Sequence, residues 1–218
     1  MIGGILPLAV TVAISPVPII AAILMLLSPR ATATSLAFLL GWTVGLAVVI
    51  VLFTLLSGLA VPSEGGSPVV GVIKIVLGIL LLVVGLLQWR NRPREGKAPA
   101  MPRWMSAIDS MTVPRAALLA FVLAAVNPKN LIAALSAGVD IGTGGLNAGE
   151  VTLAVVIFLL VAISTVAVPV FAHLIAGDRV TAALESLRAW LTVNNAVVMS
   201  VLLVVIGVVN IGHGVAAL

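Results

Sequence analysis

The feature that most constrains this chain is a series of long apolar segments separated by short polar stretches. They cover residues 2–27, 34–60, 68–88, 115–139, 151–175 and 191–212. A helix needs roughly 20 apolar residues to cross a bilayer core of about 30 Å. Only 8% of the residues are charged, whereas a soluble domain carries roughly a quarter. The sequence therefore predicts an all-α integral membrane protein with about six transmembrane helices.

A basic stretch divides the chain into two halves of three predicted helices each. Residues 1–90 form the first half, 91–113 a basic loop, and 114–218 the second half, all within one membrane domain. Basic loops face the cytoplasm, so both termini are expected outside. The loop and its approach hold Arg90, Arg92, Arg94, Lys97 and Arg103. The same topology places Arg30, Arg179 and Arg188 inside, and Glu64, Asp140 and Glu150 outside.

Two proline motifs lie near the centres of the first and fourth predicted helices. Each motif opens one half, and three crossings per half turn the second half upside down, which predicts an inverted repeat. Proline removes a backbone donor and frees a carbonyl, so both helices are expected to be broken at mid-membrane. Paired breaks are typical of a transporter's binding site. The alternative is two plain kinks in which Ser and Asn satisfy the freed backbone groups. The predicted substrate-binding residues are Ser15, Pro16, Pro18, Asn127, Pro128, Lys129 and Asn130.

Lys129 is the most unusual of these residues. A lysine at mid-membrane costs roughly 2.5–3.5 kcal/mol to insert, and no predicted helix carries an acidic residue deep enough to neutralise it. It is therefore a candidate site for an anionic ligand; alternatively, it hydrogen-bonds carbonyls freed by the break. Lys74, nearer the outer end of its helix, is expected to extend its ammonium to the interface.

Other polar and small residues predict packing rather than binding. Asn194 and Asn195 are expected to lie in the first turn of the last helix and to cap it or pack there, and Asn210 to bond between helices. Residues 177–190 read as a short interfacial amphipathic helix or an ordinary loop. Close helix contacts are expected at Gly41, Gly45, Gly78 and Gly85.

Composition also argues against several classes of function. The chain has no cysteine, and His173 and His213 are far apart, so neither thiol chemistry nor a metal site is expected. No nucleophile–base pair can be assembled, so we expect neither an enzyme nor a cofactor. The basic residues cluster between apolar segments, which fits a membrane surface and not nucleic acid.

The two motifs resemble those of a known family. Residues 14–20 (ISPVPII) and 127–131 (NPKNL) look most like the GAP family of the lysine-exporter (LysE) superfamily, whose members are called peptidoglycolipid- or sulfolipid-addressing proteins. The resemblance implies a bacterial inner-membrane protein that assists export of cell-envelope glycolipids. Ser-Pro-Val-Pro replaces the Pro-Gly-Pro of the amino-acid exporters, and the thiol-reductant carriers need a cysteine that this chain lacks.

Taken together, these features predict export of an anionic cell-envelope lipid through a midplane site. Two alternatives stay open: an exporter of a small solute, either an amino acid or an anion, and a non-transporting scaffold that recruits a larger lipid exporter through the basic loop. The expected partners are the bilayer, an anionic lipid or small molecule, and in the scaffold case the larger exporter. The sequence leaves a homodimer, the substrate's identity and the coupling ion open.

Overall fold

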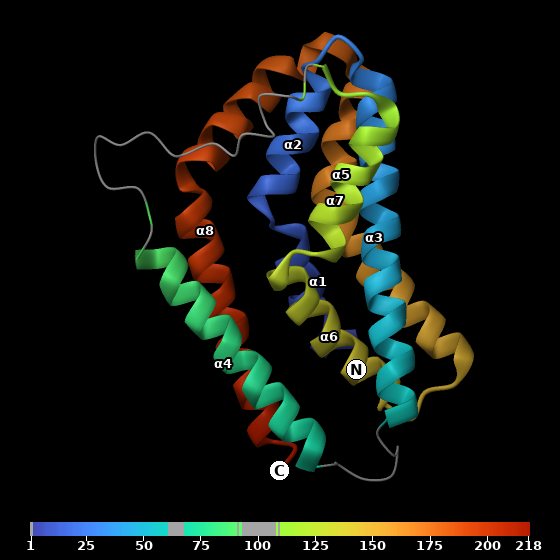
Figure 1. The fold of residues 1–218 in the computed structure, drawn as a ribbon, viewed down its shortest axis with the longest axis vertical. Helices are drawn as coiled ribbons and strands as arrows, with labels where there is room; N and C mark the ends of the chain where they lie inside the picture. Colours follow the sequence, from blue (N-terminus) through green and yellow to red (C-terminus); the bar gives the residue numbers. More distant parts are fainter. Residues whose placement is uncertain (1, 61–67, 91, 93–107, 109) are drawn as a thin grey trace.

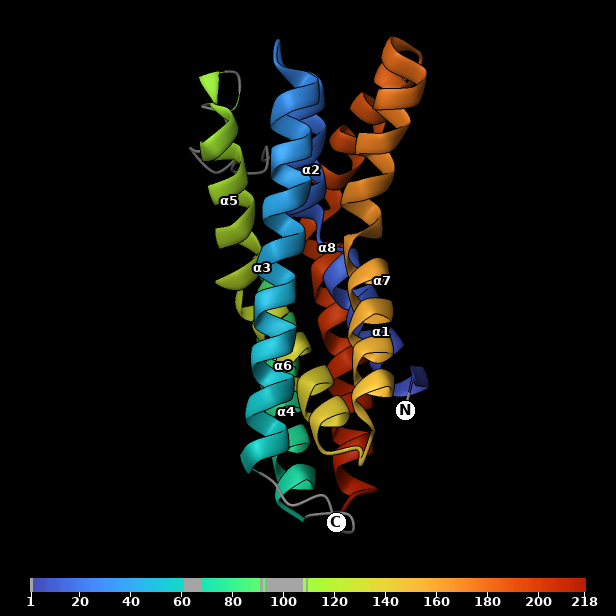
Figure 2. The ribbon, with the colours of Figure 1, turned by 90° about the vertical axis from the view of Figure 1, so that its right-hand side faces the viewer.

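A computed structural model describes residues 2–60, 68–90, 92, 108 and 110–218. In this part of the chain the regular structure is entirely helical (Figure 1). The helices are α1 (Ile2–Ala13), α2 (Pro16–Leu26), α3 (Ala31–Ala60), α4 (Pro68–Arg90), α5 (Val113–Ala125), α6 (Pro128–Gly142), α7 (Ala148–Ala176), the short 3₁₀ helix η2 (Gly177–Val180) and α8 (Thr181–Val215). Both chain ends lie toward the same end of the molecule, low in Figures 1 and 2.

The first and fourth predicted helices are both broken at their proline motifs. The axes of α1 and α2 differ by 51°, and those of α5 and α6 by 61°. Pro16 and Pro128 each begin the second helix of a pair, where a proline is tolerated because its missing N–H would have no helical partner. The breaks predicted from the sequence are confirmed.

The described helices give three to five candidate membrane spans, depending on whether each bent pair counts as one. Residues 148–215 are counted here as a single span, although Figure 1 shows that α7 and α8 run in opposite directions on either side of η2. A multi-pass, all-helical membrane protein is therefore established, whereas six crossings related by an inverted repeat stay a prediction.

The last helix begins earlier than its apolar segment. The sequence predicts either a separate short amphipathic helix or an ordinary loop over residues 177–190, but residues 181–190 are the first turns of the 35-residue α8. Leu184 and Leu191 are buried on its packed face while Glu185 is exposed, so the amphipathic pattern belongs to a continuous helix. The capping role expected for Asn194 and Asn195 is wrong, because both lie well inside α8.

Helices α4 and α8 pack closely along their length, and small residues recur every seven positions on both. A Cβ on Gly71 would lie 2.8 Å from the carbonyl oxygen of Gly214, and one on Gly78 would lie 2.7 Å from that of Gly207. Further along, a Cβ on Gly85 would lie 3.2 Å from the carbonyl oxygen of Ser200. Such small-residue seams let membrane helices approach backbone to backbone.

A second close contact holds α3 against α5 and α6 (Figure 2). A Cβ on Gly41 would lie 2.1 Å from the carbonyl oxygen of Ala117, and one on Gly45 would lie 2.7 Å from the Cβ of Ala124. The close packing predicted for Gly41, Gly45, Gly78 and Gly85 is confirmed, although the sequence did not reveal which helices they join.

We expect Gly207→Ala to destabilise the protein by about 1–3 kcal/mol, as overpacking typically does. The added methyl would lie 2.8 Å from the carbonyl oxygen of Gly78, so α4 and α8 would have to separate. Thermal unfolding in detergent measures the change. Gly212→Ala in the same helix is the matched control, because its Cβ would meet nothing within 4 Å. Equal melting temperatures for the two variants would contradict the close α4–α8 contact.

Candidate binding site at the two helix breaks

The first break leaves carbonyl groups of α1 without their helical donors. In a continuous helix Ser15 N–H would bond to Thr11 O, but here it donates to Ala13 O at 2.8 Å. Pro16 has no N–H to offer Val12 O. The Ser15 side chain is buried but does not cap α2, and Pro16 and Pro18 are buried in the first turn of α2. The break therefore presents backbone acceptors at mid-helix.

The second break is repaired by its own asparagines. The Asn127 side chain accepts a hydrogen bond from the Lys129 backbone N–H at 3.1 Å and so caps α6. Asn130 is fully buried, and its Nδ2 donates to Leu123 O and Ala124 O, both at 3.3 Å. Ala124 O is the carbonyl that Pro128 leaves without a donor, since proline carries no N–H. The alternative in which Asn satisfies the freed groups thus holds at this break.

Lys129 joins the two breaks. Its side chain is 3% exposed, and Nζ donates a hydrogen bond of 2.5 Å to Thr11 O of α1. The alternative predicted for it, a hydrogen bond to a freed carbonyl, is what the structure contains. An ammonium has three N–H donors, and this contact is the one hydrogen bond of Nζ among the described residues. Anion binding at Lys129 stays a prediction.

Thr165 of α7 makes a second contact to the end of α1. Its Oγ1 donates to Ala13 O at 2.5 Å, so the end of α1 is held between α6 and α7. Sequence analysis missed this residue. A threonine inside an apolar helix ordinarily bonds a carbonyl of its own preceding turn, so its sequence carries no signal of a contact to another helix.

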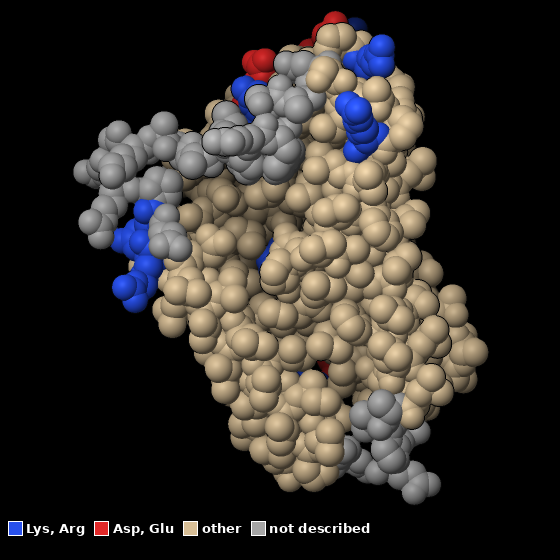
Figure 3. Space-filling model, viewed as in Figure 1, with Lys and Arg blue, Asp and Glu red and all other residues tan. Residues whose placement is uncertain are grey.

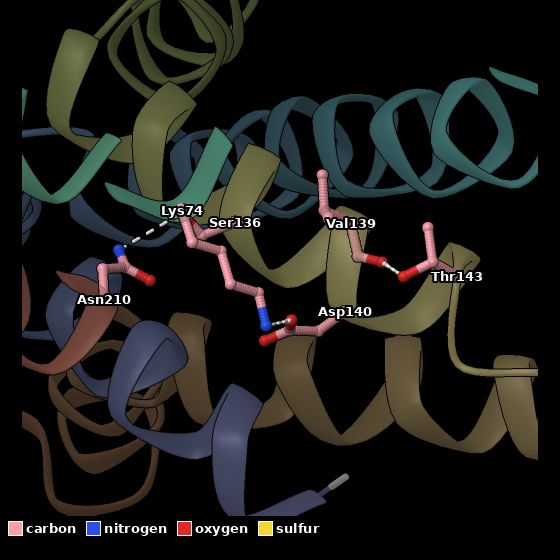
Figure 4. A network of polar contacts seen from close by, with 6 residues as sticks. All are labelled: Lys74, Ser136, Val139, Asp140, Thr143 and Asn210. Carbon is pink, nitrogen blue, oxygen red and sulfur yellow. Dashed lines mark hydrogen bonds and ion pairs between the residues drawn. The ribbon is translucent and has the colours of Figure 1, made fainter. Parts of the chain in front are cut away.

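A polar stripe continues along α6 from the break toward the end where the chain termini lie. Lys129, Ser136 and Asp140 are seven and then four residues apart, which places them on one face of the helix. Asn210 of α8 donates to Ser136 Oγ at 3.2 Å (Figure 4), which confirms its predicted role between helices.

Lys74 and Asp140 form an ion pair between α4 and α6 (Figure 4). Their side chains are only 14% and 15% exposed, so the expectation that Lys74 extends to the interface is wrong. The fourth apolar segment predicted from the sequence ends at residue 139, whereas α6 continues through Asp140 to Gly142. An acidic residue therefore does lie inside a helix, although its partner is Lys74 and not Lys129.

Charged side chains are unevenly distributed over the molecule. On the face drawn in Figure 3, basic and acidic residues both gather toward the end opposite the chain termini, further basic residues lie along one flank, and the rest is almost wholly uncharged. Arg94, Lys97 and Arg103 of the predicted basic loop lie outside the described residues. In the described part of the chain, no three His, Asp or Glu side chains gather as metal ligands would.

These features define a class: a multi-pass helical membrane protein in which two broken helices meet at a buried lysine. A family model described as Sap, sulfolipid-1-addressing protein, matches residues 5–216, so the chain belongs to this family. No curated protein and no solved structure matches the sequence. The match establishes one part of the resemblance inferred from the sequence, namely membership of the sulfolipid-addressing family.

We expect Asp140→Asn to lower the free energy of unfolding by about 1–3 kcal/mol, because it leaves the Lys74 ammonium without its counter-ion. The loss should stay below that of a fully buried pair because both side chains are 14–15% exposed. Chemical denaturation in detergent, with Glu185→Gln as an exposed acidic control, measures it. In a double-mutant cycle with Lys74→Gln, strictly additive effects would mean that the two charges do not stabilise each other.

Proposed function

We propose that this protein is a bacterial inner-membrane transporter that moves an anionic cell-envelope glycolipid, with the headgroup held where the two helix breaks meet. Membership of the sulfolipid-1-addressing family supports the lipid class. The observation that carries the site is the buried Lys129, whose ammonium bridges the two breaks through Thr11 O.

The groups around Lys129 suit a charged sugar headgroup. An anionic oxygen interacts more strongly with an ammonium than a neutral carbonyl does, so it can replace Thr11 O as the lysine's partner. The N-termini of α2 and α6 lie at the breaks and favour negative charge. Asn130 Oδ1 is buried and has no hydrogen-bond partner in the described part of the chain, so it can accept from a headgroup hydroxyl.

The pattern of helix contacts supports a rocking movement of two related halves. Three kinds of contact between the halves have a counterpart under this repeat. Helix α3 contacts α5 as α7 contacts α1, α3 contacts α6 as α7 contacts α2, and α4 contacts α6 as α8 contacts α2. The contacts of α1 with α6 and with α8 have no such counterpart among the main helix contacts of the described residues. The three matched kinds of contact are what six crossings in an inverted repeat would produce. When the headgroup replaces Thr11 O as the partner of Lys129, one of the two bonds that join the halves at the first break is released.

The distribution of charge supports the proposed orientation. Arg30 follows α2, Arg115 lies in the first turn of α5, and Arg179 lies between α7 and α8, all at helix ends on the side away from the chain termini. The positive-inside rule makes that side cytoplasmic and places both termini outside. We assign the site to binding and not to enzyme catalysis.

A scaffold for a larger lipid exporter is the second candidate. Arg90 and Arg92 are exposed at the end of α4, and the Arg92 guanidinium lies 4.2 Å from the centroid of the Trp89 ring. Such a basic and aromatic surface at the membrane face is suited to recruiting an acidic partner. Charge reversal at both arginines abolishes function under this hypothesis, whereas Lys129→Gln leaves it intact.

The deciding experiment measures translocation of an anionic glycolipid by the purified protein in liposomes. We expect Lys129→Gln to slow it roughly tenfold to a hundredfold, because a hydrogen bond to a charged group contributes about 1.5–3 kcal/mol. Thr165→Val is the matched control, since it also removes a contact to the end of α1 but leaves the charge.

The comparison of the two variants separates binding from structure. Under the proposed function only Lys129→Gln loses the preference for anionic over zwitterionic lipid. Equal losses of translocation in both variants would mean that Lys129 only holds the helices together. Unchanged transport by a folded Lys129→Gln protein would exclude the proposed midplane site.

A further inference from the structure

A groove of about 320 Å³ lies between α2, α7 and the first turns of α8. It is distinct from the lysine site, which lies on the α6 side of α1. The lining residues are Ile19, Ser164, Thr165, Val168, Pro169, Leu187 and Leu191.

The chemistry of the groove favours an apolar occupant. Its two hydroxyl groups are both engaged within the protein: Ser164 Oγ donates to Val161 O at 2.7 Å, and Thr165 Oγ1 donates to Ala13 O. Val168 and Leu187 are 65% and 40% exposed, so the groove opens on the surface that meets lipid. An alkyl chain fits these walls, whereas a polar ligand would find no free side-chain partner.

The position of the groove connects it to the first helix break. Ile19 lies one turn beyond Pro16 on α2, and Thr165 is the residue that holds the end of α1. Pro169, which has no N–H, leaves the carbonyl of Thr165 without its helical donor. A molecule in the groove would therefore contact Thr165, which bonds to Ala13 O in the same last turn of α1 that Lys129 contacts at Thr11 O.

Two charged residues lie close to the lining residue Leu187 on α8: Glu185 is exposed, whereas Arg188 is half-buried. Arg188 follows the lining residue Leu187 and lies half-buried on the packed face of α8 with Leu184 and Leu191. It has no ion-pair partner within the described ranges. Trp190, 55% exposed, is placed as aromatic residues are at the headgroup level. This combination is complementary to a negatively charged headgroup attached to an alkyl chain.

We propose that the groove binds one acyl chain of an anionic lipid whose headgroup lies at Arg188, and that it delivers the lipid to the helix breaks. This inference rests on the proposed function and adds the entry site to it. An acyl chain gains little by leaving the bilayer for the groove, because both surroundings are apolar. Selection therefore comes from Arg188, and the test must measure preference between headgroups.

The experiment uses the wild-type protein in phosphatidylcholine nanodiscs with a trace of photoactivatable lipid. Phosphatidylglycerol and phosphatidylcholine carry the same diazirine-labelled acyl chain, and mass spectrometry maps the cross-links. We expect phosphatidylglycerol to label α7 around Val168 about fivefold more than phosphatidylcholine does, which corresponds to the interaction of one basic residue with an anionic lipid. Leu160 is 61% exposed on the same helix but does not line this groove, so its labelling should show no preference between the two lipids.

Two arginine variants assign the charge. Arg188→Gln should abolish the preference at Val168, while Arg179→Gln, in the exposed turn before α8, should leave it unchanged. Equal labelling by the two lipids at Val168, or a preference that survives Arg188→Gln, would overturn the proposal.

Because labelling needs no transport, this test fails independently of the proposed function. A groove preference together with normal translocation by Lys129→Gln would retain the lipid site and discard the midplane site. The reverse result, lost translocation without any groove preference, would retain the midplane site and discard the groove.

Discussion

The structure depends on one constraint: a backbone hydrogen-bonding group in a membrane must find its partner within the protein. Two prolines, each near the centre of a predicted membrane helix, lack the N–H that a carbonyl of the preceding turn would need as its partner. At the second break, Asn130 supplies the donor that Pro128 lacks. At the first, the donors come from distant segments, Lys129 of α6 and Thr165 of α7. The bonds to Thr11 O and Ala13 O at the first break therefore form only when the two halves of the chain are packed together.

The remaining helices pack so that this polar centre stays enclosed. Glycines at seven-residue spacing bring α4 and α8 to backbone contact, and Gly41 and Gly45 do the same for α3 and α5. On the inner side of α4, Lys74 reaches the polar stripe of α6 at Asp140. The polar interactions therefore lie between helices, while apolar side chains cover the surface that faces lipid.

The two proposed ligand contacts meet at the end of α1. Lys129 bonds to Thr11 O there, and Thr165, which lines the apolar groove, bonds to Ala13 O. A lipid has the two chemical parts that such an arrangement distinguishes, a charged headgroup and an alkyl chain. Membership of the sulfolipid-1-addressing family agrees with a ligand of this kind.

The sequence by itself determined the apolar helices, both breaks and the unusual position of Lys129, because hydrophobic length and a missing N–H are local properties of the chain. Only the tertiary structure decided which partners these groups find. Asp140 resembled a loop residue because glycines follow it, and Thr165 resembled any small polar residue of a membrane helix. Their roles depend on Lys74 and Ala13, which lie far away in the sequence, and a contact of that kind exists only once the helices have packed.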